Sequence, residues 1–248
     1  VTVTGPALLA TGAITINTSA NVTDQTGAIS FTSTIDNAQA LTLTAGGADV
    51  TVSGAIGNTA ALTSLTVSGN DISLANIGGA AAGVTGATGV TAATSGADTG
   101  SITFAGTTYK TDGTQTYTAP AGYNLLVNGG AATTFTTTDD AVSFATADVQ
   151  LANGSDLTVT TAGGAITANK IDGTSAEDVT LSSTVGTAKT VSVGAIGTGT
   201  ANGINTVALT GATSVTLNGN ITTDNSTGNS VTVTGPALLA TGAITINT

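Results

Sequence analysis

Short runs in which apolar residues alternate with Thr or Ser recur along this sequence, and most of them end in Gly, Asn or Asp. The clearest examples are VTVTG at 1–5, AITIN at 13–17, ALTLTAGG at 40–47, LTVSG at 65–69, LTVTTAGG at 157–164 and TVSVG at 190–194. Side chains of a β-strand point alternately to its two faces, so such a run gives a strand with one apolar and one polar face, followed by a turn. No segment has the apolar spacing of an amphipathic helix. The sequence therefore predicts an all-β chain with almost no helix.

An internal repeat adds a second constraint. The segment VTVTGPALLATGAITINT at 1–18 recurs without a change at 231–248, so position 231 corresponds to position 1. A repeat of this kind points to units that stack on one another. We therefore expect 1–248 to form a single continuous segment from the interior of a longer protein, namely one 230-residue tandem unit at 1–230 followed by the start of the next at 231–248. The alternative interpretation is that the duplication is artificial and that the chain forms discrete particles.

The predicted strands are spaced as in a parallel β-solenoid, or β-helix. Every second interval between strand centres, for example from Thr180 to Ala208, covers about 24 to 28 residues, which is the length of one coil, so the repeating unit holds roughly nine coils. An antiparallel sandwich has similar strand spacing, but it needs larger core side chains than a chain with 4 Phe and no Trp offers. The predicted inward positions are aliphatic instead: Val1, Val3, Ile14, Ile16, Leu41, Leu43, Val50, Val52, Val191 and Val193.

Composition removes most catalytic and binding chemistries. The chain has no His, Cys or Arg, which excludes catalytic triads, thiol nucleophiles, disulfides and Cys-based zinc sites. Its 3 Lys against 14 Asp and Glu give a net charge of −11, which disfavours binding to nucleic acid or anionic lipid, and no apolar run is long enough to span a bilayer as a helix. Thr supplies 56 of the 248 residues, and we expect Thr and Ser to form ladders between coils in place of surface charges.

The region 76–140 is less regular than the rest and is expected to include a protrusion. Residues 76–100 are of low complexity and rich in Gly, Ala and Thr, which is typical of weak coils or of a protruding loop. Residues 104–144 contain all three Tyr and three of the four Phe. This concentration predicts either a thicker core or a lateral contact in that stretch.

The run GAISFTSTIDNAQALTLTAGGADVTVSGAIGNTAALTSLTVSG at 27–69 resembles the low-complexity β-helical repeats of giant bacterial surface proteins of the filamentous haemagglutinin type. The pattern extends over most of the chain and is weakest at 76–140. The resemblance implies a right-handed parallel β-helix, secretion across a bacterial envelope, and a role in adhesion, a sheath or a fibre. It transfers no catalytic residues. Near-identical tandem units are unusual for that family's shafts and favour a uniform filament over a single tipped adhesin.

Few residues are candidates for a chemical site. The adjacent carboxylates Asp139-Asp140 and Glu177-Asp178 could perform the acid–base chemistry of β-helical polysaccharide lyases and hydrolases, but no basic partner accompanies them, and turn positions explain them better. Ca²⁺ is the one metal with potential oxygen ligands, although none matches a known calcium loop. The potential calcium ligands are Asp24, Asp112, Asp156 and Asp224.

Two kinds of modification site can also be read from the sequence. Glycosylation sequons lie at Asn17, Asn21, Asn153, Asn220 and Asn225. Isopeptide crosslinks would need a lysine, and the chain has Lys110, Lys170 and Lys189.

Together these features lead us to expect a structural protein and not an enzyme. We expect an extracellular filament or stalk at a bacterial cell surface that resists proteases. Its partner is expected to be another copy of itself, through end-to-end continuation or lateral contacts between rods. The alternative is the shaft of an adhesin that contacts a host or neighbouring-cell surface through 104–144 or through a region outside this sequence. A carbohydrate-active β-helix and an ice-binding solenoid are the remaining alternatives.

Overall fold

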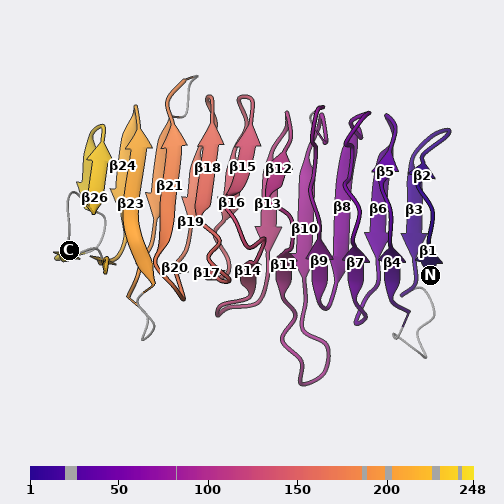
Figure 1. Ribbon diagram of the computed structural model, residues 1–248, viewed down its shortest axis with the longest axis horizontal. Helices are drawn as coiled ribbons and strands as arrows, with labels where there is room; N and C mark the ends of the chain where they lie inside the picture. Colours follow the sequence, from indigo (N-terminus) through magenta and orange to yellow (C-terminus); the bar gives the residue numbers. More distant parts are fainter. Residues whose placement is uncertain (20–26, 82, 186–188, 199–202, 225–229, 240–241) are drawn as a thin grey trace.

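The computed structural model describes residues 1–19, 27–81, 83–185, 189–198, 203–224, 230–239 and 242–248. Within these residues it contains 28 β-strands and no helix, and all pairings between the named strands are parallel. The strands stack into a β-solenoid of about nine turns, which confirms the predicted fold class. The coils follow one another in chain order along the long axis, so the two termini lie at opposite ends (Figure 1).

Each turn passes through three faces in chain order. The first face contains β1 (Thr2–Val3), β4 (Ile29–Phe31), β7 (Val50–Val52), β9 (Ile72–Leu74), β11 (Ile102–Phe104), β14 (Leu125–Val127), β17 (Val149–Leu151), β20 (Ile171–Asp172), β25 (Ile221–Thr222) and β28 (Ile246–Asn247). The second face contains β2 (Ala7–Leu8), β5 (Ile35–Asp36), β12 (Thr108–Lys110), β15 (Thr133–Thr137), β18 (Leu157–Thr161), β21 (Glu177–Ser183), β23 (Ile204–Gly211) and β26 (Val231–Thr234). The third face contains β3 (Ile14–Asn17), β6 (Ala40–Thr44), β8 (Ser64–Gly69), β10 (Thr88–Ala92), β13 (Gln115–Thr118), β16 (Val142–Phe144), β19 (Ile166–Ala168), β22 (Thr190–Val193), β24 (Ser214–Leu217) and β27 (Ala237–Leu239).

Single-residue bridges complete the faces where a turn has no regular strand. On the first face, Ile196 bridges Ile171 of β20 and Ile221 of β25. On the second face, Ile56 and Ile77 continue the ladder from Ile35 of β5 to β12. Each face therefore runs along the whole solenoid.

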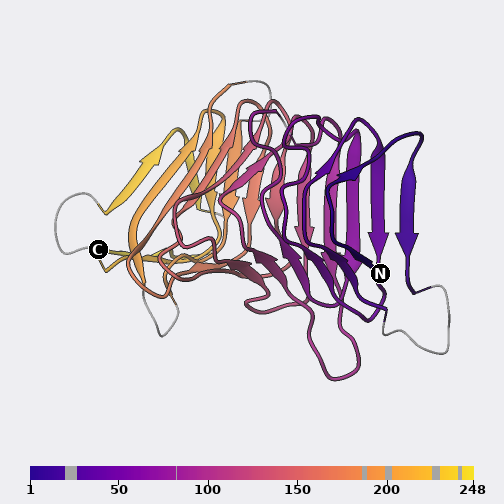
Figure 2. The ribbon, with the colours of Figure 1, turned by 45° about the vertical axis from the view of Figure 1, so that its right-hand side comes forward.

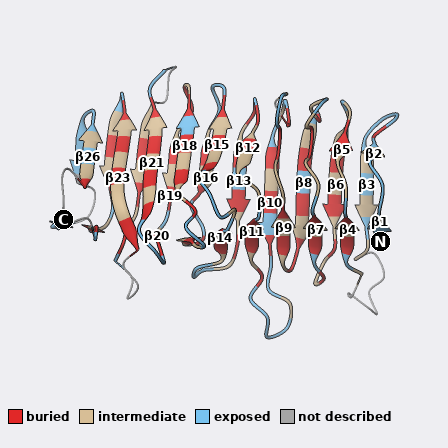
Figure 3. Ribbon diagram, in the orientation of Figure 1, coloured by how far each residue is buried: buried red, intermediate tan, exposed pale blue. Residues whose placement is uncertain are grey.

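Alternation within each strand places one row of side chains inside the solenoid, and on the third face this row is apolar except at Thr88 and Gln115. Along the third face the inward row stacks in register from β3 to β24 as Ile14, Leu41, Leu65, Thr88, Gln115, Val142, Ile166, Val191 and Val215. The predicted inward residues from Leu41 to Val193 are buried. Val1 is the exception, with 56% of its surface exposed, and Val3, Ile14 and Ile16 are only half-buried, because they belong to the terminal coil (Figure 3).

The outward row of the third face is the predicted ladder of hydroxyl side chains. It runs in register as Thr15, Thr42, Thr66, Gly89, Thr116, Ser143, Thr167, Ser192 and Thr216, and it is interrupted at Gly89, which has no hydroxyl. A second row, Asn17, Thr44, Ser68, Thr91 and Thr118, lies beside it in the coils from β3 to β13. Parallel stacking thus lets Thr and Ser cover a surface that holds few charges.

Coil length varies more than the sequence spacing predicts. One coil leads from Ser30 to its partner Thr51, whereas a considerably longer one leads from Ser73 to its partner Thr103. This longer coil contains the connection between β10 and β11, which extends away from the body of the solenoid (Figures 1 and 2). An antiparallel bridge between Ser95 and Asp98 closes that loop.

The aromatic residues of 104–144 thicken the core. Five of the six rings are buried, and Tyr123 alone is partly exposed, at 37%. The Phe104 ring lies at the centre, edge-on to Tyr117 at 4.8 Å and to Phe135 at 4.9 Å between ring centroids. Of the two sequence-based readings of this stretch, the thicker core is the one that the buried rings bear out.

The two identical segments occupy different faces. In residues 1–18 the strands β1, β2 and β3 lie on the first, second and third faces, whereas in residues 231–248 the same sequence forms β26, β27 and β28 on the second, third and first faces. Nine steps along the first face lead from β1 to β25, and one more face leads to β26. The offset between the two copies therefore corresponds to nine and one-third turns.

Candidate functional site

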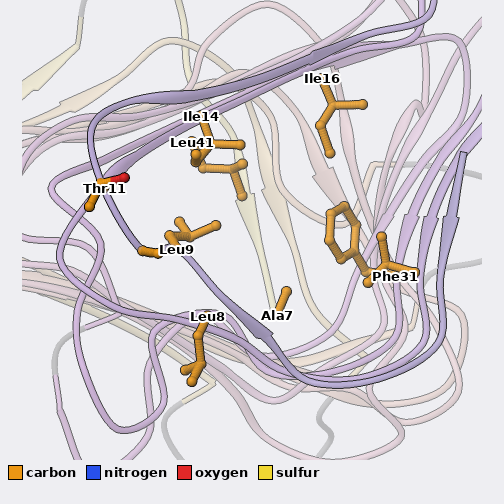
Figure 4. A pocket seen from close by; sticks show the side chains of 10 residues that line it. Ala7, Leu8, Leu9, Thr11, Ile14, Ile16, Phe31 and Leu41 are labelled. Atoms are coloured by element: carbon orange, nitrogen blue, oxygen red, sulfur yellow. The ribbon is translucent and has the colours of Figure 1, made fainter.

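The N-terminal end of the solenoid is an open, apolar end of the core. A hollow of about 340 Å³ lies inside the first coil, and its lining is almost entirely aliphatic (Figure 4). The lining residues are Val3, Ala7, Leu8, Leu9, Ala10, Thr11, Ile14, Ile16, Phe31 and Leu41. Leu8 is 74% exposed, although its neighbour Leu9 is buried. Every interior coil has its core covered on both sides, whereas the first coil pairs on one side only.

The C-terminal end has a similar character. The strands β26, β27 and β28 are the last members of their faces, and Leu238 and Ile246 expose 55% and 46% of their surface. The identical segment therefore presents apolar side chains and strand edges at both ends of the structure. Such edges are the usual templates for pairing with another chain.

The two candidate carboxylate pairs lie at the ends of second-face strands: Asp139-Asp140 follow β15, and Glu177-Asp178 begin β21. Asp139 and Asp140 lie exposed in the turn between β15 and β16. Glu177 is buried and accepts hydrogen bonds from the backbone N–H groups of Thr174 (2.9 Å) and Ser175 (2.7 Å). Its side chain closes the turn before β21, but Glu177 and Asp178 themselves begin that strand, so the turn interpretation holds for Asp139-Asp140 and not for this pair.

Asp178 and several other Asp residues bridge successive coils. The Asp178 carboxylate accepts hydrogen bonds from the Thr206 N–H (3.0 Å) and hydroxyl (2.7 Å) in the next coil, and the Asp156 carboxylate accepts one from the Asp178 N–H at 2.9 Å. Asp71 does the same for Ser101. Sequence reasoning missed this role, although a signal was present, because each of these Asp residues directly precedes an aliphatic residue that starts or enters a strand.

The potential calcium ligands are dispersed. Asp112 accepts a hydrogen bond from the Thr138 hydroxyl, Asp156 bridges to β21, and Asp224 is exposed at the far end; Asp24 lies outside the described residues. Across the described ranges, no group of three His, Cys, Asp or Glu residues is placed to hold a metal ion. A polar hollow elsewhere, beside the β10–β11 loop, includes Asp49 and Asp98.

The sequons and lysines lie at the surface or near it. Asn17, Asn153 and Asn220 are exposed, and Asn21 and Asn225 lie outside the described residues. Lys110 and Lys189 are half-buried. Glycosylation and isopeptide crosslinking are hypotheses that the sequence itself did not favour.

Lys170, Tyr123 and Asp172 form one cluster on the surface beside the first face. The Lys170 ammonium lies 2.8 Å from the Asp172 carboxylate and 4.9 Å from the centroid of the Tyr123 ring. Lys170 donates to the Tyr123 hydroxyl, which donates to Asp172. Burial lowers the pKa of Lys170, but its hydrogen bonds with Asp172 and Tyr123 outweigh that effect and raise the pKa overall. The three side chains join non-adjacent coils and thereby brace the surface.

Two buried tyrosines of the core, Tyr109 and Tyr117, have strongly raised pKa values. Burial raises the pKa of Tyr109 far above its ordinary value, and the hydrogen bond from the Gly106 N–H offsets only part of that effect. Burial, and then the proximity of Tyr109, raise the pKa of Tyr117 as well. Their hydroxyls donate to the Leu74 carbonyl (2.9 Å) and to the Gln115 side chain (3.0 Å), so the neutral phenols are fully accommodated.

This arrangement predicts alkaline unfolding. A folded-state pKa above the ordinary value of 10.0 means that stability is fully present below that pH and is lost as the pH rises above it, because the unfolded chain releases the protons more readily. In an alkaline titration, tyrosinate absorbance from Tyr109 and Tyr117 should appear together with the loss of β-sheet circular dichroism. Tyr123→Phe should leave that coincident step in place. Complete ionisation of all three tyrosines in a chain that keeps its β-sheet signal would contradict the prediction.

The fold thus defines the class of this protein as a parallel β-solenoid. Comparisons with protein-family models, with curated proteins and with solved structures gave no match. Among the described residues, no helix is long and apolar enough to cross a membrane.

Proposed function

We propose that this chain is a structural segment of an extracellular filament or stalk at a bacterial cell surface, in which solenoid coils continue from one unit to the next. The observation that carries the proposal is the placement of the repeated segment: residues 231–248, identical in sequence to 1–18, continue the stack by pairing in register with β23, β24 and β25. A stack of coils gains stability from each added neighbour, since each coil buries the apolar face of the one before it. Continuation of the stack from one unit to the next is therefore favourable.

The surface supports a durable rod. Parallel ladders of hydroxyl side chains and bridging Asp residues connect successive coils along its length. The three lysines are the only sites that trypsin could recognise, and all three are at least partly buried within or next to strands. Cleavage requires local unfolding around them, which a continuous ladder opposes.

The adhesin alternative has less to support it in 104–144. The aromatic residues that would form a receptor-binding patch are mostly in the core, and the exposed one, Tyr123, is engaged by Lys170 and Asp172. Attachment through a region outside this sequence stays compatible with a rod-like shaft.

The test is electron microscopy and fibre diffraction of the assembled chain. We expect thin unbranched fibres with a meridional spacing of about 4.8 Å between coils and an axial period of about 43 to 48 Å, which corresponds to nine to ten turns at that spacing. Discrete particles that never associate end to end would overturn the proposal.

Protease treatment gives an independent check. Assembled material should survive trypsin for hours, whereas the same chain denatured with detergent and heat should be cut at Lys110, Lys170 and Lys189. Degradation of the native material within minutes would count against a durable rod.

A further inference from the structure

We propose that the polar hollow beside the β10–β11 loop binds a Ca²⁺ ion through the carboxylates of Asp49 and Asp98 and the side-chain carbonyl oxygen of Asn70. The bound ion fastens the loop to the body of the solenoid. This site lies within a single chain, so it does not depend on the filament proposal. None of its three residues is among the calcium ligands that the sequence suggested.

The hollow lies where the β10–β11 loop meets earlier coils. Asp49 directly precedes β7, Asn70 directly follows β8, and Asp98 lies in the loop. The Ser95–Asp98 bridge closes the loop. A hydrogen bond from Asn70 Nδ2 to the Asp98 carboxylate (2.8 Å) connects the loop to the body. Segments that are far apart in the sequence thus bring side-chain oxygens to one place.

The buried amide of Asn70 is the observation that points to a bound cation. Asn70 lines the hollow and is only 4% exposed, and its Oδ1 atom is buried and accepts no hydrogen bond from the described residues. Turning the amide over does not solve this, because it places the carbonyl oxygen against the Asp98 carboxylate, where Nδ2 now donates. A buried carbonyl oxygen without a partner is costly. A cation in the hollow gives it one.

The charge of the hollow also favours a cation. Asp49 and Asp98 contribute two carboxylates to the lining, and the residues that line it include no lysine. The Asp49 carboxylate accepts one hydrogen bond, from the Asp71 N–H at 3.3 Å, and the Asp98 carboxylate accepts the one from Asn70. Both carboxylates therefore keep lone pairs for a further ligand. The net charge of −11 raises the concentration of cations near the surface as well.

The kind of ligand favours Ca²⁺ over Mg²⁺. Ca²⁺ accepts about six to eight oxygen ligands in irregular geometry, including amide carbonyls and waters, whereas Mg²⁺ demands a near-ideal octahedron. The Ser95 hydroxyl is a further oxygen in the lining, and a hollow of about 340 Å³ leaves room for several waters of about 30 Å³ each. With only two charged ligands, we expect a Kd of about 0.1 to 1 mM, the range of extracellular calcium modules.

Calcium titration of the whole chain tests the site. Isothermal titration calorimetry with CaCl₂ should give a Kd in that range. Hydrogen exchange of the amides in 93–100 should slow about tenfold when Ca²⁺ is present at about ten times the Kd, because the ion holds the loop closed. MgCl₂ should bind at least about tenfold more weakly. Absence of both the heat of binding and the slower exchange would overturn the proposal, and equal binding of Mg²⁺ would overturn the assignment to calcium.

Two pairs of substitutions separate this site from a general attraction of cations to an acidic protein. Asp49→Asn with Asp98→Asn keeps the size of the side chains but removes both charges, so it should weaken Ca²⁺ binding about tenfold or more. Asp139→Asn with Asp140→Asn removes the same charge from an exposed turn and should leave Ca²⁺ binding and loop exchange unchanged. Circular dichroism should show the same β-sheet signal for both.

Equal weakening by the two pairs would show that Ca²⁺ is only a diffuse counter-ion and would overturn the proposal. Electron microscopy of the same variants gives a separate result. Loss of fibres with calcium binding intact would count against the filament proposal alone.

Discussion

Replacing Phe104 with alanine should lower the free energy of unfolding by about 3 to 5 kcal/mol, the usual cost of removing a buried aromatic side chain. Phe104 is fully buried on β11, and its ring contacts Tyr109, Tyr117, Phe135 and Phe144 at centroid separations of 4.8 to 6.2 Å. These contacts lie within the coil of β11–β13 and connect it to the next coil, β14–β16, so the cavity weakens the packing between these two coils. Denaturant unfolding followed by circular dichroism measures the loss.

Two further variants make this result interpretable. Phe104→Leu should recover a large part of the stability, because it refills most of the cavity. Val185→Ala removes a side chain that is 61% exposed, and it should change the free energy of unfolding by less than about 0.5 kcal/mol. Equal effects of Phe104→Ala and Val185→Ala would show that the aromatic cluster does not stabilise the solenoid.

Replacing Gly57 with alanine should destabilise the solenoid by about 3 kcal/mol or more, through backbone strain and a steric clash together. Gly57 follows the bridge residue Ile56 and has φ of +64°. A Cβ atom there would lie 2.0 Å from the Gly83 carbonyl oxygen in the next coil. Since that atom belongs to the backbone, the two coils would have to move apart.

Gly154→Ala is the control that separates strain from clash. Gly154 has nearly the same φ, +68°, but a Cβ atom there meets no atom within 4 Å. Only the left-handed backbone strain remains, so the expected cost is about 1 kcal/mol. Thermal or chemical unfolding of both variants checks the difference; equal costs would show that coil spacing at Gly57 is not limiting.

The carboxylates illustrate how much of the site the sequence could predict. Turn positions were the favoured reading for Asp139-Asp140 and Glu177-Asp178; the structure places the first pair in a turn, whereas the second begins β21, where Glu177 closes the preceding turn. The hydrogen bonds from Thr206 to Asp178 were not predictable, because they join residues 28 positions apart whose proximity depends on coil length. The buried Gln115 was missed for a related reason: its amide is accommodated by Tyr109, Thr136 and Tyr117, which only the stacked coils bring together.

Local patterning determined the strands and their two sides. Alternation of aliphatic residues with Thr and Ser depends only on neighbouring positions, so it predicts which side chains of β6, β8 or β22 point inward wherever those strands lie. The small aliphatic side chains and the recurrent spacing then favoured a parallel solenoid over a sandwich. These features depend only on short segments, so they can be recognised without knowledge of the rest of the chain.

Tertiary structure alone decided where each segment lies around the solenoid. Residues 1–18 and 231–248 have one sequence, yet they occupy the first, second and third faces in one case and the second, third and first in the other. A segment's face is set by the summed lengths of the coils before it and by the strand edge available for pairing. The coils differ in length, as the coil from Ser30 to Thr51 and the longer coil from Ser73 to Thr103 show. These differences shift the face on which a later segment lies, and a local sequence pattern does not predict them.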